Sequence, residues 1–143
     1  MRFLKYLIVF IVIIGFFAFL SRKDEPTFQK IKIKETVIKV ELADDSPKQI
    51  KGLSGKDKLG ENSGMFFVYN KPGIRSVWMK DMKFPIDIIW IDENKKIIGI
   101  ESGVKPESYP KSFESPEPVK YILETNSGLA EKYGFKPGAL VDF

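Results

Sequence analysis

Cysteine and histidine are both absent from the 143 residues of the chain. Their absence excludes disulfide bonds, thiolate nucleophiles, histidine-containing catalytic triads, haem ligation and Cys/His zinc sites. Any chemistry must therefore rely on carboxylates, amines, hydroxyl groups or backbone atoms. The length accommodates one domain and an appendage, and not two independent cores.

A charge excess is also missing from most of the chain. The formal net charge is +4, and Arg2, Lys5, Arg22 and Lys23 account for all of it because they precede the first acidic residue, Asp24. The remainder carries equal numbers of basic and acidic side chains. Nucleic-acid binding depends on clustered positive charge, so we expect no nucleic-acid partner.

Motifs for phosphate and metal binding are missing too. The segment Gly52-Leu53-Ser54-Gly55-Lys56 is too short between its glycines for a phosphate-binding loop, and Asp57 stands where Ser or Thr is needed. No twelve-residue calcium loop fits any acidic cluster. We therefore expect no cofactor and no metal.

One long apolar run is present near the start of the chain. Tyr6 to Leu20 contains no charge, and Phe3 and Leu4 extend the run past Lys5. As a helix, these positions span roughly 27 Å, close to the bilayer core of about 30 Å. We predict that residues 1–23 form an uncleaved signal anchor, a single transmembrane helix.

A cleavable signal peptide is the alternative for this segment. Such a peptide ends in an Ala-x-Ala-like site, and no such site occurs between Gly15 and Ser21. Arg2, Lys5 and the terminal amine favour a cytoplasmic N-terminus, whereas Arg22 and Lys23 on the other flank weaken this preference. The expected location is the cell membrane, with the C-terminal domain outside the cytoplasm, or a secreted protein if the leader is removed.

The remainder divides into a tether, residues 24–30, and a domain, residues 31–143. Alternating apolar residues predict a hairpin of two strands over 31–42 and a strand over 119–123. Short apolar runs predict strands over 65–69 and 86–91, the latter paired with 97–100 around a polar turn, and Pro72-Gly73 predicts a turn. A last strand is predicted to end at Phe143. Short helices are predicted after Ser46-Pro47 and over 129–133, and a long loop over 101–118. No long helix connects two strands, so the pattern predicts a mostly β fold: a compact antiparallel rolled sheet or barrel with two short helices.

Several spaced motifs carry a family resemblance. They are Gly64-Met65-Phe66-Phe67-Val68, Trp78-Met79-Lys80-Asp81-Met82, Phe84-Pro85-Ile86-Asp87-Ile88 and Leu123-Glu124. Together they resemble the signature of the domain of unknown function 192 (DUF192) family over about residues 31 to 143. The resemblance implies a small β-rich domain, often behind a signal or membrane segment, with no assigned reaction. Lys56, Asp81 and Ala139 depart from the residues usual in that family, which are Arg, Asn and Asp.

The consecutive residues Trp78, Met79, Lys80 and Asp81 are the first candidate site. In a strand, Trp78 and Lys80 face one way and Met79 and Asp81 the other. In one interpretation, Trp78 or Met79 packs in the core and Lys80 and Asp81 are solvated. In the other, the four residues form a shallow ligand platform, with Trp78 for stacking and Lys80 as an electrostatic anchor.

Two acidic residues in apolar runs, Asp87 and Glu124, are the second candidate. A buried carboxylate needs a partner, and Lys80 or backbone amides near Pro85 are available to Asp87. Glu124 either caps the helix after Asn126-Ser127 or joins Asp87. In a shared pocket, the two carboxyl groups would serve as acid and base in hydrolysis.

These candidates support three functions. The first is a membrane-anchored, non-catalytic module outside the cytoplasm that binds a small ligand or an envelope protein through residues 78–81. The second is a carboxylate-dependent hydrolase of envelope carbohydrate or peptide, which requires Asp87 and Glu124 to lie about 5 to 9.5 Å apart. The third is purely structural support of a neighbouring membrane protein, which predicts no pocket.

Overall fold

A computed structural model describes residues 28–143 of the chain. The predicted anchor, residues 1–23, lies outside the described residues. Within them, no helix has the length and apolar character needed to cross a membrane. The strands and helices are β1 (Phe28–Ile33), β2 (Thr36–Ala43), α2 (Ser46–Lys51), β3 (Ser63–Gly73), β4 (Ser76–Trp78), β5 (Ile86–Ile91), β6 (Ile97–Val104), η1 (Pro106–Ser108), β7 (Ser112–Glu114), β8 (Val119–Asn126), α3 (Leu129–Lys132) and β9 (Val141–Asp142).

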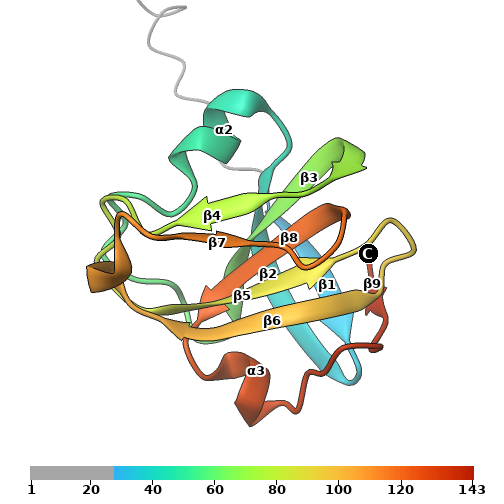
Figure 1. Ribbon diagram of the computed structural model, residues 1–143. Coiled ribbons are helices and arrows are strands. Elements are labelled where there is room, and N and C mark those ends of the chain that lie inside the picture. Colours follow the sequence, from blue (N-terminus) through green and yellow to red (C-terminus); the bar gives the residue numbers. More distant parts are fainter. Residues whose placement is uncertain (1–27) are drawn as a thin grey trace, which may run out of the picture.

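Seven strands form one curled sheet in the order β6-β5-β8-β3-β2-β1-β9, and β4 and β7 form a separate ribbon (Figure 1). All neighbours are antiparallel except β2 and β3. The two sheet edges meet: the Ile97 amide donates to the Ala139 carbonyl at 2.9 Å, and the Val141 amide donates to the Lys95 carbonyl at 2.9 Å. The sheet is a curled half-barrel whose edges, within the described residues, touch only beside the start of β6. The expectation of a mostly β fold with two short helices is confirmed.

The inner face of the curled sheet carries the larger core. Strand alternation sends every second side chain inward, and α3 adds residues at one end (Figure 1). The buried members are Ile31, Ile33, Ile38, Val40, Phe66, Ile89, Ile91, Ile97, Tyr121, Leu123, Leu129, Ala130, Phe135 and Val141.

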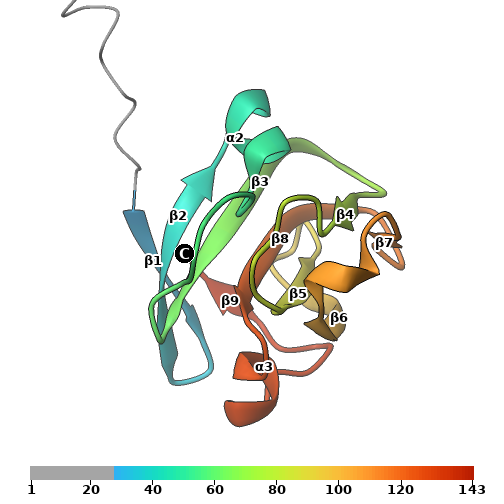
Figure 2. The ribbon, with the colours of Figure 1, turned by 90° about the vertical axis from the view of Figure 1, so that its left-hand side faces the viewer.

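The outer face of β3, β8 and β5 is buried as well. The β4-β7 ribbon lies over it, as the side view shows (Figure 2). The buried members of this second core are Ala43, Leu53, Met65, Phe67, Met79, Ile86, Ile88, Trp90, Val104, Val119 and Ile122. Because both faces of β5 are covered, all six of its residues are buried, including Asp87.

Three local predictions are wrong in detail. The strand β3 runs through Pro72-Gly73 instead of turning there, because its pairing with β8 shifts register between Val68 and Gly73. In that irregular stretch, the missing amide hydrogen of Pro72 costs no ladder bond. The predicted loop over 101–118 contains the end of β6, η1 and β7. The first strand begins at Phe28, within the segment predicted as tether.

Candidate functional site

A cavity of about 70 Å³ lies between α2, with the loop that follows it, and β4. This volume exceeds the share of two water molecules in the liquid, about 30 Å³ each. We call it the Glu124 cavity, because Glu124 contributes its one acidic side chain. The lining residues are Gln49, Ile50, Lys51, Gly52, Leu53, Ser54, Phe67, Tyr69, Ser76, Val77, Trp78, Met82, Ile86 and Glu124.

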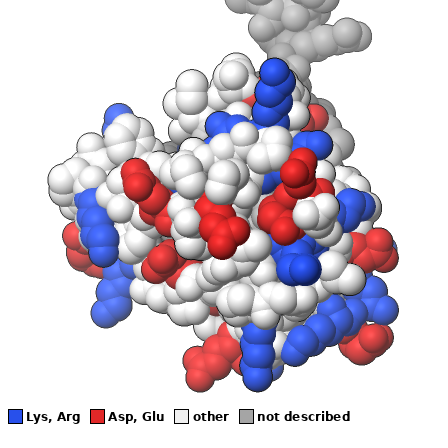
Figure 3. Space-filling view, turned by 45° about the vertical axis from the view of Figure 1, so that its right-hand side comes forward, with Lys and Arg blue, Asp and Glu red and all other residues white. Residues whose placement is uncertain are grey.

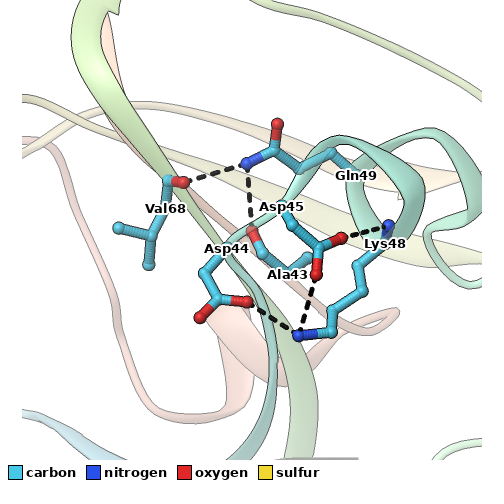
Figure 4. A network of polar contacts seen from close by, with 6 residues as sticks. All are labelled: Ala43, Asp44, Asp45, Lys48, Gln49 and Val68. Atoms are coloured by element: carbon cyan, nitrogen blue, oxygen red, sulfur yellow. Dashed lines mark hydrogen bonds and ion pairs between the residues drawn. The ribbon is translucent and has the colours of Figure 1, made fainter. Parts of the chain in front are cut away.

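One wall of the Glu124 cavity is α2, which polar contacts hold against the sheet (Figure 4). Asp45 caps the helix by accepting the Lys48 amide at 2.8 Å. The side-chain nitrogen of Gln49, Nε2, donates to the backbone carbonyls of Ala43 at 3.2 Å and Val68 at 2.9 Å. These bonds join α2 to β2 and β3, so the helix has a defined position over the sheet.

The loop after α2 is bonded to the turn that follows β4. Gly52 begins the loop with φ of 50°, a left-handed conformation that glycine adopts without a steric cost. The Ser54 hydroxyl donates to the Lys80 carbonyl at 2.8 Å, and the Gly55 amide donates to the Asp81 carbonyl at 2.9 Å. The cavity is thus bounded by two segments that are held together.

The four consecutive candidates Trp78 to Asp81 have different positions. Trp78 is 52% exposed, lines the cavity, and packs edge-to-face against Tyr109 with ring centroids 6.1 Å apart. Met79 is buried in the second core. The Lys80 ammonium lies 5.9 Å from the Trp78 ring, within cation–π range, and Asp81 is an exposed turn residue with φ of 56°. Of the four, only Trp78 lines the cavity.

Glu124 lies near the middle of the sheet. It pairs with Met65 of β3 on one side and with Ile88 of β5 on the other, and all three face the second core. Its side chain is 4% exposed, and burial raises its pKa to about 8. No hydrogen bond or ion pair from residues 28–143 reaches this carboxyl group. It is a buried acid whose partner is not supplied by the described part of the chain.

Asp87 lies on the opposite face of the sheet. Its pairing partner is Thr125, whereas Glu124 pairs with Ile88, so strand alternation separates the two carboxyl groups. Its oxygens accept three backbone amides: Gly103 at 2.9 Å, Gly128 at 3.1 Å and Ala130 at 3.0 Å. These bonds fix the start of α3 and the end of β6.

The structure therefore does not bring Asp87 and Glu124 together. The shared pocket that the hydrolase interpretation requires is absent from the described residues, because the sheet backbone stands between the two side chains. Backbone amides do satisfy Asp87, but they belong to β6 and α3 and not to the neighbourhood of Pro85. It is Asp87, and not Glu124, that contacts the first turn of the helix after Asn126-Ser127.

Sequence reasoning missed several residues of the cavity, notably Gln49, Ser54 and Tyr69. Tyr69 was recognisable in part, because it follows Phe67 by two positions and so faces the same side of β3. Gln49 and Ser54 carry no sequence signal, because they reach the cavity only through the packing of α2 and its loop. Residues 28–143 contain no group of three or more acidic residues that would hold a metal ion.

The surface charge is mixed. The face shown in Figure 3 carries Asp and Glu side chains, several of them near its centre, with Lys and Arg side chains around them. Several exposed pairs are in contact, among them Lys83 with Asp57 at 2.7 Å and Lys132 with Glu61 at 3.3 Å. This face therefore presents no continuous basic surface of the kind that binds phosphate backbones.

Comparison with known proteins places the chain among proteins of unassigned function. The DUF192 family, described as uncharacterized ACR, matches residues 29–143. No curated protein matches the chain.

Two solved structures are similar. A protein of unknown function from Novosphingobium aromaticivorans is 29% identical, with a TM-score of 0.79 and coverage of 86% of this chain and 90% of that chain. A protein from Sinorhizobium meliloti, provisionally assigned as a transcription regulator, is 26% identical, with a TM-score of 0.79 and coverage of 84% and 96%.

Proposed function

The chain belongs to the DUF192 family of uncharacterized proteins, and we propose that it is a non-catalytic module that binds a small ligand in the Glu124 cavity. One observation carries the proposal: Glu124 is buried, lines the cavity and has no partner among the described residues. Burying a carboxyl group that has no hydrogen bond to the protein is costly, because it loses part of its hydration without gaining protein hydrogen bonds. A bound ligand would supply them.

The composition of the cavity supports a ligand site. Binding pockets combine apolar walls with a few polar groups that orient the ligand. Here Leu53, Phe67 and Ile86 supply apolar wall, and Glu124 and Tyr69 supply polar groups. Trp78 adds a half-exposed aromatic ring at the rim, where a ligand would cover it.

Catalysis receives less support from the same geometry. The proposed acid and base pair requires two carboxyl groups at one pocket, and Asp87 lies on the other face of the sheet with three amides bound. A single carboxyl group beside an aromatic ring is sufficient for binding.

We further propose that residues 1–23 hold this module at the outer face of the cell membrane. The support is the apolar run from Tyr6 to Leu20, which is flanked by Arg2 and Lys5 on its N-terminal side. Extraction of membranes with alkaline carbonate tests the proposal: the full chain should stay with the lipid, and a variant lacking residues 1–23 should be released. Release of the full chain would contradict the anchor.

The cavity itself is tested by ligand screening with the full chain in detergent. Trp78 is half-exposed and Trp90 is buried, so a ligand at the rim should change the fluorescence of Trp78. We expect at least one compound from a panel of small amines, polyols and carboxylic acids to bind to the wild type and not to Trp78→Ala, as measured by calorimetry.

Leu140→Ala is the matched control, because Leu140 is exposed and does not line the cavity. Equal binding by wild type, Trp78→Ala and Leu140→Ala for every hit would contradict the site.

A further inference from the structure

We propose, resting on the proposed function, that the group received by the Glu124 cavity is a protonated amine, whose N–H groups bind the Glu124 carboxylate while its carbon chain leaves past Trp78. The ligand class is therefore an alkylammonium compound. The argument depends on the unpartnered acid, on the charged groups around it, and on the aromatic ring at the rim.

The acid is placed to receive hydrogen bonds. An ionised carboxylate only accepts hydrogen bonds and has about four lone-pair sites on its two oxygens, whereas an ammonium group has three donors and no acceptor. Glu124 uses none of those sites within residues 28–143 and faces the cavity. Charge-assisted hydrogen bonds of this kind are about twice as strong as neutral ones.

No described cation already fills this role. The other titratable groups of the cavity are Tyr69 from β3 and Lys51 from α2, and Lys51 is exposed. Arg75 lies over the Tyr69 ring at 3.9 Å and donates to the Lys71 carbonyl. None of these groups forms an ion pair with Glu124.

The remaining element at the rim, the turn after β4, carries Lys80. Its ammonium lies 5.9 Å from the Trp78 ring. It forms no ion pair with Glu124, so an incoming amine would supply the counter-charge.

The walls favour a cation over an anion or a neutral group. The faces of aromatic rings attract ammonium groups, and Trp78 and Phe67 both line the cavity. A ligand carboxylate would meet an acid that has no cation beside it. A cavity of about 70 Å³ holds an ammonium group and a short alkyl segment, so larger parts of the ligand would stay at the rim.

Binding of an amine should depend on pH in a defined direction. Burial raises the pKa of Glu124 to about 8, so the carboxyl group is mostly protonated at pH 6 and half ionised at pH 8. An ammonium ligand binds the ionised form. Its affinity should therefore rise by about 50-fold between pH 6 and pH 8, the ratio of the ionised fractions.

A matched series of three-carbon probes tests the inference: n-propylammonium, 1-propanol and propionate. Each is titrated into the full chain in detergent, with Trp fluorescence and calorimetry as readouts, at pH 6 and pH 8. We expect n-propylammonium to bind most tightly and to show the rise with pH. Glu124→Gln should reduce its affinity by at least 10-fold, whereas the control Glu117→Gln, which changes an exposed glutamate, should leave it unchanged.

The outcomes separate the two proposals. If 1-propanol or propionate binds more tightly than the amine, or amine affinity falls between pH 6 and pH 8, the amine inference is wrong and the ligand site stands. If no probe binds and the ligand panel also fails to distinguish Trp78→Ala from the wild type, both proposals fail. The pH dependence of the wild type needs no variant, so the test holds even if Glu124→Gln does not fold.

Discussion

Replacing Glu124 by Gln should change how the stability of the protein depends on pH. The unfolded chain releases the Glu124 proton near the model value of 4.5, whereas burial raises the pKa to about 8 in the folded protein. Between these values the folded state holds a proton that the unfolded state has lost. The folded state therefore binds more protons, and the stability of the wild type falls as pH rises.

The size of the effect follows from the two pKa values. One proton of difference corresponds to about 1.4 kcal/mol for each pH unit. From 4.5 to about 8, the full contribution is about 5 kcal/mol. This is a large share of the 5 to 15 kcal/mol that is typical of a domain. Glutamine has nearly the same shape and does not titrate, so Glu124→Gln lacks this component.

Urea unfolding of wild type and variant at pH 5, 6, 7 and 8 measures the difference. At pH 5 the two free energies of unfolding should differ mainly by the constant effect of the substitution itself. At each step up to pH 8, the free energy of unfolding of the variant should rise relative to that of the wild type. The control Glu117→Gln should follow the wild type at every pH, because Glu117 is exposed. A difference between Glu124→Gln and wild type that does not change with pH would refute the reasoning, since it would mean that folding does not raise the pKa of Glu124.

Two further predictions concern the residues that build the sheet. Asp87→Asn should destabilise the protein by about 3 kcal/mol, because an NH₂ group would face at least one of the three buried amides that now bind the carboxylate; urea unfolding checks this, and a loss no larger than that of the exposed Asp142→Asn would contradict it. Gly64→Ala should cost about 3 kcal/mol, because a Cβ atom at Gly64 would overlap the carbonyl oxygen of Glu124 on the neighbouring strand. Gly73→Ala is the control and should destabilise the protein less, because its Cβ atom would meet only the Arg75 side chain at ordinary contact distance. The thermal midpoints of the two variants are compared. A lower midpoint for Gly73→Ala than for Gly64→Ala would contradict the prediction and show that β3 and β8 separate easily at Gly64.

Much of the fold follows from local patterns in the chain. Alternation of apolar side chains predicts β1, β2 and β8, because a strand with one buried face repeats every two residues. A continuous apolar run predicts β5, which is buried on both faces. The Ser46-Pro47 pair predicts the start of α2, because proline is tolerated in the first helical turn, and Asp45 supplies the cap. The motifs from Gly64 to Glu124 indicate the family, and the family match confirms it.

Tertiary structure alone decided the roles of the two buried acids. Asp87 and Glu124 look alike in the sequence, since each is an acidic residue within an apolar strand. The pairing of β5 with β8 places them on opposite faces, and a shift of one residue in that register would have placed both on the same face. The backbone amides that donate to Asp87 belong to β6 and to the start of α3, and no local sequence pattern predicts that they contact Asp87.

The sequence by itself thus determined most of the strands of the large sheet, that the fold is mostly β, and which family the chain belongs to. Only the tertiary structure decided that one acid is satisfied by the backbone and the other faces a cavity beside Trp78. The physical reason is range: strand periodicity and helix capping act over a few residues, whereas the environment of a buried carboxyl group depends on strands and loops that are distant in the chain.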